Sequence, residues 1–294
     1  IDIGPQCSKP YDCDFMEHCW ANIPETSVFD LYRLSATKKF DLIKSGIVRY
    51  QDIPEDTILS PIQRLQVETH LSESLAVDKE GIKQFLDKLQ HPLSFFDFET
   101  FYEPIPRYDG QRPYMQMPFQ YSLHVLKRGC ELEHYEYLGS SDTDPRGELC
   151  KRMLEDIPAS GSILAYNMGF ELAQIKSLAQ IYPQCHDALM SMTDRFVDLI
   201  EPFRSGAYYH PQFKGSFSIK SVLPALITDD EVLSYDSLAI HEGSMATEAF
   251  LELGRVNDQV YKDKIREELL AYCRLDTLAM VRILSKLEEL VSAD

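Results

Sequence analysis

The spacing of hydrophobic residues along the chain changes near residue 92. Before that point apolar positions recur every three to four residues, which is the period of an amphipathic helix. After it, an apolar and aromatic run at 93–98 and two alternating stretches have the composition and the period of two that strands show. The first part of the chain is therefore expected to be helical, and the sheet to begin at residue 93.

This pattern predicts the individual elements. The early helices are expected at 29–34, 40–47, 62–71 and 81–89. The strands are expected at 93–98, 119–126, 131–138 and 162–166, with a turn at 127–130. The later helices are expected at 147–156, 170–181, 218–226, 260–272 and 276–291, and the stretch 196–235 is mixed. Strands followed mostly by helices predict an α/β or α+β domain over 92–294, preceded by a small helical region, 26–91, and a cysteine-containing segment, 1–25.

The charge balance narrows the classes of function. The 294 residues include 29 Lys and Arg against 47 Asp and Glu, a formal net charge of −18. This excludes a protein that coats long duplex by charge, because such binding grows with the number of phosphates that Lys and Arg neutralise. It does not exclude a metal-dependent enzyme, whose ligand carboxylates are balanced by cations. With 44% hydrophobic residues, the composition is that of a folded chain.

The cellular compartment of the protein is predicted from the absence of membrane-spanning and signal segments and from the number of cysteines. It contains no run of about 20 apolar residues that would span a membrane and no basic-then-apolar signal peptide. The seven cysteines are an odd number, which fits reduced thiols better than a disulfide framework. We therefore expect a cytoplasmic protein without membrane partners. Because the chain opens at Ile1 rather than Met, we interpret it as a fragment of a longer protein.

The most informative acids are Asp97 and Glu99, in the predicted strand at 93–98. Residues two apart on a strand project from the same face. Two carboxylates side by side on an apolar strand are costly unless a positive charge lies between them, and hard oxygen ligands favour Mg²⁺ or Mn²⁺. The alternative is a strand end at which both acids reach solvent.

Two later segments add polar residues at defined spacings. Ala165-Tyr-Asn-Met-Gly-Phe-Glu171 leads from a strand into a helix, with Asn167 at a cap-like position and Glu171 in the first turn. This arrangement is also common as an ordinary helix start with a favourable acid. Tyr272 and Asp276 are four residues apart at a predicted helix junction, on one helical face. Taken alone, they would be a surface tyrosine and aspartate.

Together, in this order, the three segments resemble the DEDD-type (DnaQ-like, Tyr subclass) 3′–5′ exonucleases of the RNase H-like superfamily. The family's motifs are Asp-x-Glu, Asn-x-x-Phe-Asp and Tyr-x-x-x-Asp, and the chain departs from them at Glu171, where most members have Asp. The resemblance implies an α/β fold, an RNase H-like mixed sheet flanked by helices.

The resemblance also implies a mechanism and its residues. Two Mg²⁺ or Mn²⁺ ions would be bound by four carboxylates, and a tyrosine would orient the attacking water. These residues are Asp97, Glu99, Glu171 and Asp276 for the metals and Tyr272 for the water. Asn167 is expected to bind substrate. From their own positions in the sequence, Lys220 is expected either to contact a phosphate or to be a solvated surface residue, and Asp198 either to support the site or to be structural. The expected partners are single-stranded DNA or RNA ends.

A narrower resemblance covers most of the chain. It is similar to an uncharacterised bacterial family in which a DnaQ-like domain follows a RecB-like nuclease module with cysteines. The similar segments are Ile3–Cys7, Pro10–Cys13, Pro104–Gln120, Gly215–Pro224 and Asp276-Thr277. Through this resemblance Cys7, Cys13 and Cys19 correspond to the end of a four-cysteine iron–sulfur site, whose fourth cysteine would lie upstream in a longer protein. Zinc held with His18 and free thiols are the alternatives.

One segment is basic within this acidic chain. Residues 33–49 contain five Lys or Arg and one Asp. Within it, Leu42–Ile47 resembles the glycine turn of helix-hairpin-helix modules, which bind the phosphate backbone; the alternative is an ordinary helical turn.

Three functions remain open from the sequence. The first is a metal-dependent 3′–5′ exonuclease on single-stranded ends. The second is a nucleic-acid-binding or adaptor module with a degenerate nuclease site that works with a partner nuclease domain. The third is a phosphodiesterase that acts on a small nucleotide with the same metals.

Overall fold

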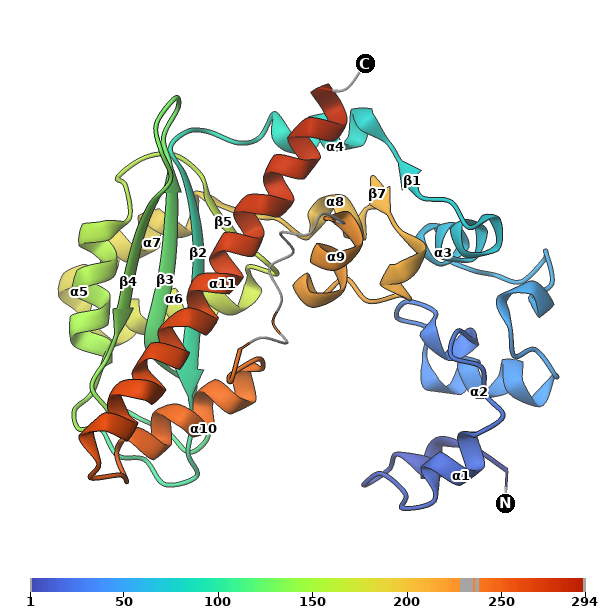
Figure 1. Ribbon diagram of the computed structural model, residues 1–294, viewed down its shortest axis with the longest axis horizontal. Helices are drawn as coiled ribbons and strands as arrows, with labels where there is room; N and C mark the ends of the chain where they lie inside the picture. The colour runs from blue at the N-terminus through green and yellow to red at the C-terminus, as the bar shows by residue number, and fades with distance from the viewer. Residues whose placement is uncertain (1, 228–234, 236–237, 293–294) are drawn as a thin grey trace. The chain divides into compact units, whose positions relative to one another are not determined.

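The computed structural model describes residues 2–227, 235 and 238–292 (Figure 1). By its internal contacts the chain divides into two compact units. The first consists of residues 1–82 together with 202–226, and the second of residues 83–201 together with 227–294. The first unit therefore includes the segment 202–226, which is separated in the sequence from the rest of this unit by 119 residues, 83–201, of the other unit. The division predicted from the sequence, at residues 25 and 91, follows the chain in order and remains a prediction.

The first unit is mainly helical. Its α-helices are α1 (Met16–Trp20), α2 (Ala36–Lys44), α3 (Pro61–Ser72), the start of α4 (Lys79–Leu86), α8 (Glu201–Arg204) and α9 (Ile219–Leu226). Its 3-10 helices are η1 (Pro5–Cys7), η2 (Val28–Asp30), η3 (Tyr50–Asp52) and η5 (Pro211–Phe213). Two short strands, β1 (Ala76–Val77) and β7 (Tyr208–Tyr209), pair antiparallel and join the N-terminal part of the unit to 202–226.

A glycine packs the segment 202–226 against η2, which a buried amide of the same unit supports. Gln66 is 1% exposed and donates to the Asp30 carbonyl oxygen and the Tyr50 hydroxyl, at 2.8 and 2.7 Å. Gly215 has a φ of +76°, and a Cβ there would lie 2.0 Å from the same Asp30 oxygen. Only glycine allows this approach, so the backbone at residue 215 packs directly on η2.

Two predictions in the first unit change in the structure. The helix predicted at 29–34 is the single 3-10 turn η2, because Ser27 and Asp30 form a reciprocal capping box and Leu31 is extended. The Gly46 turn ends α2, with the amide of Gly46 bonded to the Ile43 carbonyl and that of Ile47 to the Leu42 carbonyl. The next element is η3, so the turn amides are used within α2 rather than between two α-helices.

The second unit contains a five-stranded mixed sheet. Its strands are β2 (Leu93–Phe101), β3 (Met117–Leu126), β4 (Glu133–Leu138), β5 (Ile163–Ala165) and β6 (Phe196–Asp198), in the order β4-β3-β2-β5-β6. The pairs among β2, β3 and β4 are antiparallel, and the pairs among β2, β5 and β6 are parallel. The central strand is therefore β2, which carries the first pair of candidate acids.

Helices cover both faces of this sheet (Figure 1). They are α5 (Arg146–Asp156), α6 (Gly169–Ile181), α7 (His186–Thr193), α10 (Gly243–Leu253) and α11 (Gln259–Ser292), with η4 (Pro183–Cys185) between α6 and α7. Phe96 and Phe98 of β2 belong to the core that α5, α6 and α7 cover. Residues alternate along a strand, so Asp97 and Glu99 face the opposite side, where α10 and α11 pack. The predicted α/β fold, with a mixed sheet flanked by helices, is confirmed.

The C-terminal part differs most from the predicted elements. The two helices expected at 260–272 and 276–291 are one continuous helix, α11, because the intervening Cys-Arg-Leu contains neither glycine nor proline. Helices α7 and α10 were not predicted. The stretch expected to be mixed, 196–235, contains β6, α8, β7, η5 and α9, and its residues 228–234 lie outside the described residues.

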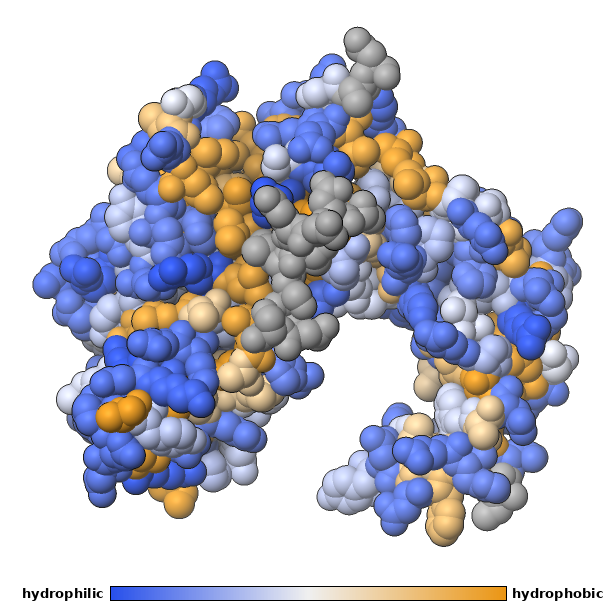
Figure 2. Space-filling view, in the orientation of Figure 1, coloured by the Kyte–Doolittle hydropathy of each residue, from blue (hydrophilic) through white to orange (hydrophobic). Residues whose placement is uncertain are grey.

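The face of the molecule drawn in Figure 2 is mostly hydrophilic, and hydrophobic residues gather on it in several groups. Among the described helices, none combines the length and the apolar composition needed to cross a membrane.

Candidate functional site

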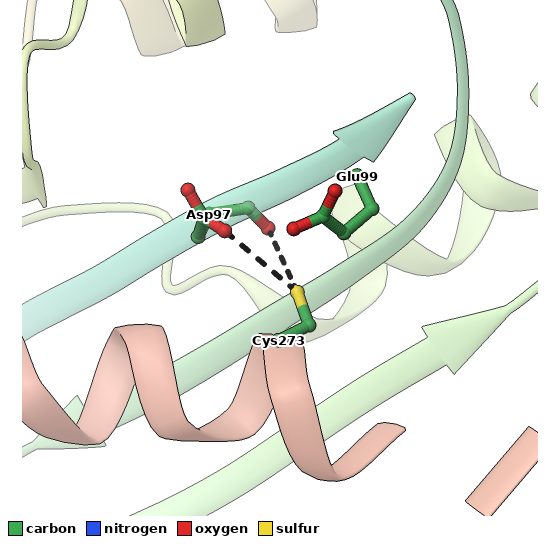
Figure 3. Close-up of side chains that lie close together, drawn as sticks. All are labelled: Asp97, Glu99 and Cys273. Carbon is green, nitrogen blue, oxygen red and sulfur yellow. Dashed lines mark hydrogen bonds between the residues drawn. The ribbon is translucent and has the colours of Figure 1, made fainter. Parts of the chain in front are cut away.

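The candidate site lies on the central strand β2, beneath α11. One oxygen each from Asp97 and Glu99 and the Sγ of Cys273 lie within 4.8 Å of one another (Figure 3). The Cys273 thiol donates to Oδ2 of Asp97 at 3.8 Å and is 3.9 Å from the Asp97 carbonyl oxygen. Glu99 is 7% exposed and Cys273 is fully buried, while Asp97 keeps some accessible surface. Two acids and a thiol therefore converge in a largely buried place.

The middle of α11 supplies three residues to this side of the sheet. Successive helical residues turn by about 100°, so Tyr272, Cys273 and Asp276 lie within an arc of about 100°. Tyr272 is 5% exposed. Tyr235, from the linker before α10, donates its hydroxyl to Oδ1 of Asp276 at 2.5 Å, and its ring centroid is 6.4 Å from that of Tyr272. The third sequence motif thus faces the first.

Polar contacts fix the position of α11 along the sheet. Gln120 Nε2 in β3 donates to the Leu269 carbonyl oxygen at 2.8 Å. The Thr277 hydroxyl is 2.7 Å from the Ser122 hydroxyl and 2.8 Å from Nδ1 of His124. These contacts lie on both sides of Tyr272 and Asp276 in the helix. Because buried polar groups require partners, they prevent α11 from sliding past β2 and β3.

Glu171 lies in the first turn of α6. Its side chain is 3% exposed, and its Oε2 has no hydrogen-bond partner among the described residues. Burial, and then the charge of Asp198, raises the pKa of Glu171 to about 7. A buried carboxylate oxygen without a partner is costly, so this side chain is suited to a cation.

The charges of three other carboxylates act on Asp97, although of these four acids only Asp97 and Glu99 have an oxygen in the group within 4.8 Å. Burial raises the pKa of Asp97 well above its ordinary value, and the charges of Asp276, Glu99 and Glu171 raise it further, whereas the Cys273 thiol lowers it. These acids come from β2, α6 and α11, which are far apart in the sequence. Divalent cations relieve such like-charge repulsion, and carboxylate oxygens are the ligands that Mg²⁺ and Mn²⁺ prefer. The residues present therefore fit the ions that the sequence predicted.

Asp198 has a structural role in shaping the second motif. Its Oδ1 accepts hydrogen bonds from the backbone amides of Asn167 at 2.7 Å and Ile200 at 3.3 Å. Asn167 is exposed, with a left-handed φ of +68°, and the residue that caps α6 is Met168 rather than Asn167. Asp198 therefore holds the turn from which α6 begins, and its charge acts on Glu171.

Other predicted site residues lie elsewhere in the structure. Lys220 is exposed on α9, in the first unit. Cys7 is buried, whereas Cys13 and Cys19 are exposed. In the described part of the chain, the carboxylates and thiol at β2 are the one group of three or more His, Cys, Asp or Glu residues whose ligand atoms lie within 4.8 Å. The N-terminal cysteines and His18 do not converge in this way, and an iron–sulfur site in a longer protein remains a prediction.

Sequence reasoning missed two residues of this site. Cys273 belongs to none of the three sequence motifs, although its place beside Tyr272 in a helical segment is a signal that puts it near the same face. Tyr235 had no recognisable signal, since it lies outside any helix or strand pattern and meets Asp276 only in the folded chain.

Comparisons with known proteins give a family match and two relatives. Residues 94–218 match a family described as a domain of unknown function (DUF2779). The matched range contains β2 and α6, with Asp97, Glu99 and Glu171, and ends before α11. No solved structure matches the chain with significance.

The two relatives are bacterial. The chain is 25% identical over 230 residues to the uncharacterized protein MG366 of Mycoplasma genitalium, a match that covers 71% of this chain and 34% of that protein. It is 24% identical over 218 residues to the uncharacterized protein UU173 of Ureaplasma parvum, covering 67% of this chain and 31% of that protein. The chain thus spans about a third of the length of the curated relatives that it matches.

Proposed function

We propose that the chain carries a DEDD-type 3′–5′ exonuclease site of the RNase H-like superfamily, which hydrolyses phosphodiester bonds at single-stranded nucleic-acid ends. The observation that carries this proposal is the convergence of Asp97 and Glu99 on β2, with Glu171 and Asp276 close enough for their charges to raise the pKa of Asp97. The three sequence motifs that supply these acids lie on β2, α6 and α11. The mixed sheet flanked by helices also agrees with the fold that the resemblance implies.

The four carboxylates would hold two Mg²⁺ or Mn²⁺ ions. Such ions lower the pKa of a bound water and offset the charge that develops on the phosphodiester and its leaving 3′-oxygen. Asp97 is the best candidate for a shared ligand, because each of the other three carboxylates acts on it. Glu171 contributes an oxygen that has no other partner among the described residues.

The tyrosines orient groups rather than remove protons. Burial, and then the charges of Asp276, Glu99 and Asp97, raises the pKa of Tyr272 above its ordinary value near 10. Its hydroxyl therefore stays protonated and is suited to donate a hydrogen bond to a water or a phosphate oxygen. Tyr235 donates to Asp276 and holds that carboxylate in one orientation.

Two observations favour a second candidate, a nucleic-acid-binding or adaptor module with a degenerate site. The Cys273 thiol donates to Asp97 and so competes for one of its oxygens. Glu171 has a longer arm than the aspartate that the resembled family carries at this position. Such a module would bind strands without cleaving them.

The location that we propose is the cytoplasm. All seven cysteines are free, as expected in a reducing compartment.

The decisive experiment measures whether the protein cleaves single strands and from which end it shortens them. The protein is incubated with 3′-labelled or 5′-labelled single strands of DNA and RNA, in Mg²⁺, Mn²⁺ or EDTA. Asp97→Ala tests the site, and Asp187→Ala, an exposed acid in the first turn of α7, is the matched control. We expect stepwise shortening from the 3′ end that requires metal, is lost in Asp97→Ala and persists in Asp187→Ala.

Other outcomes separate the candidates. Binding of strands without cleavage under every metal condition would rule out the exonuclease and support the adaptor. Hydrolysis of a small nucleotide ester, with strands left intact, would support the third function.

A further inference from the structure

The thiol of Cys273 is the unusual member of the site. Dedicated Mg²⁺ sites are built from oxygen ligands, whereas thiolates select softer cations such as Zn²⁺. Cys273 is fully buried, and its thiol donates to a carboxylate oxygen of Asp97. A structural thiol in a helix would be expected to pack against apolar side chains rather than between two carboxylates.

The spacing of these ligand atoms matches a tetrahedral zinc site. With Zn–S near 2.3 Å and Zn–O near 2.1 Å, tetrahedral angles place sulfur and oxygen about 3.6 Å apart. The Cys273 Sγ is 3.8 Å from Oδ2 of Asp97, and an oxygen of Glu99 completes a group within 4.8 Å (Figure 3). The sulfur–oxygen distance to Asp97 is therefore close to that of a tetrahedral site, and a Glu99 oxygen lies within 4.8 Å of both atoms.

A second observation also indicates a ligand here. The Glu171 side chain is 3% exposed, and its Oε2 has no partner among the described residues. Its charge contributes to the raised pKa of Asp97, although its oxygens lie outside the group within 4.8 Å. Glu171 or a water would supply the fourth ligand of a tetrahedral ion.

We propose that Asp97, Glu99 and Cys273 bind a thiophilic divalent cation of the Zn²⁺ class, which competes with Mg²⁺ or Mn²⁺ and inhibits the site. On binding, the Cys273 S–H bond breaks, an S–metal bond forms, and the proton passes to solvent, with no change of oxidation state. Zinc binding stands on the geometry alone, and its inhibitory effect rests on the proposed function.

Binding is tested with Cd²⁺, a Zn²⁺ analogue whose bond to a thiolate gives an ultraviolet charge-transfer absorption. The full chain is titrated with Cd²⁺ as wild type, Cys273→Ser and Asp97→Asn, and Zn²⁺ is then added as competitor. The exposed Cys130 provides the control, Cys130→Ser. We expect both site variants to lose the tightest component of the absorption and to bind Cd²⁺ weaker by about tenfold or more, while Cys130→Ser keeps that component.

Asp97→Asn keeps the test decisive if Cys273→Ser does not fold. This variant retains all seven cysteines, so its loss of the tight component shows that sulfur and carboxylate share one ion. If Asp97→Asn, or a folded Cys273→Ser, binds Cd²⁺ as tightly as wild type, the inference is overturned.

The inhibitory effect needs a separate measurement. Zn²⁺ is added to the Mn²⁺-supported hydrolysis of a single strand, and each protein is compared with its own activity without zinc. We expect the inhibitory Zn²⁺ concentration to rise about tenfold in Cys273→Ser; an unchanged value would overturn this part of the inference. If no metal supports hydrolysis, the proposed function fails, whereas the Cd²⁺ titration still decides whether the thiol site exists.

Discussion

Glu171 illustrates how one side chain connects burial with metal binding. Its position in the first turn of α6 favours a negative charge through the helix dipole. Burial and Asp198 act in the opposite direction and raise its pKa to about 7 from an ordinary value of 4.5. The native state therefore binds the proton more tightly than the unfolded chain, and Glu171 lowers stability progressively as pH rises from 4.5 through 7. Above pH 7 the full cost is present unless a cation offsets it.

Glu171→Gln is expected to separate folding from metal binding. At pH 8 in EDTA the variant should be more stable than wild type by about 1–3 kcal/mol, because a neutral amide replaces a buried charge. Mn²⁺ should stabilise the wild type, since it binds the native state, and should stabilise the variant much less. Thermal unfolding with and without Mn²⁺ measures both effects.

The matched control is Glu148→Gln, an exposed acid in the first turn of α5. It should change neither stability nor the response to Mn²⁺ by more than a few tenths of a kcal/mol. Equal stabilisation of wild type and Glu171→Gln by Mn²⁺ would contradict the assignment of Glu171 as a ligand.

At the scale of elements, α11 determines whether the site exists. This 34-residue helix carries Tyr272, Cys273 and Asp276 in its middle. Its position over the sheet depends on polar contacts with β3, among which Thr277 contacts both Ser122 and His124. Ser122 and His124 are 1% and 5% exposed, so water is a poor substitute for this hydroxyl.

Thr277→Val is expected to lower the free energy of unfolding by about 1–3 kcal/mol, because it leaves buried polar groups without their partner at nearly constant volume. Urea denaturation measures the change. Thr193→Val is the control, since the Thr193 hydroxyl bonds to the Met190 carbonyl within its own helix, and it should cost less. A Thr277→Val protein as stable as wild type would show that the contacts to β3 do not hold α11.

At the scale of the whole molecule, charge is distributed unevenly. Residues 91–294 contain 19 Lys and Arg against 32 Asp and Glu, a difference of −13, and residues 1–90 contain 10 against 15, a difference of −5. The basic segment 33–49 lies in the first unit. Lys39 is half-buried and donates to the Phe29 carbonyl oxygen, whereas Arg33, Lys38, Lys44 and Arg49 are exposed. If strands are bound, phosphate contacts are therefore expected from these four residues.

The double variant Lys38→Glu, Lys44→Glu should bind single-stranded DNA more weakly than wild type. Each phosphate contact contributes about 0.7 to the slope of log affinity against log salt for single strands, so the slope should become shallower by about 1.4. Lys151→Glu, Lys176→Glu makes the same charge change at exposed positions of α5 and α6 and is the control. Equal losses in both variants would indicate that net charge, not the basic segment, governs binding.

Local hydrophobic patterns were sufficient to predict many of the strands and helices of the second unit. The strand predicted at 93–98 is the central strand β2, and the helices predicted at 147–156 and 170–181 are α5 and α6 to within one residue at either end. Each has a strong period of its own, and the short-range preferences agree with the burial that the fold imposes. The first-turn position of Glu171 followed from the same evidence.

The sequence by itself predicted an α/β or α+β domain, which its family resemblance narrowed to α/β, a strand that carries Asp97 and Glu99, and the order of the three motifs. Only the tertiary structure decided that β2 is the central strand, that 202–226 packs with the N-terminal unit, and that Cys273 and Tyr235 join the acids. The reason is physical: periodicity and propensity act over a few neighbouring residues, whereas these features depend on contacts between distant residues, such as Tyr235 with Asp276, 41 positions apart, and Asp97 with Cys273, 176 positions apart. Such contacts form only once the sheet and its covering helices bring distant segments together.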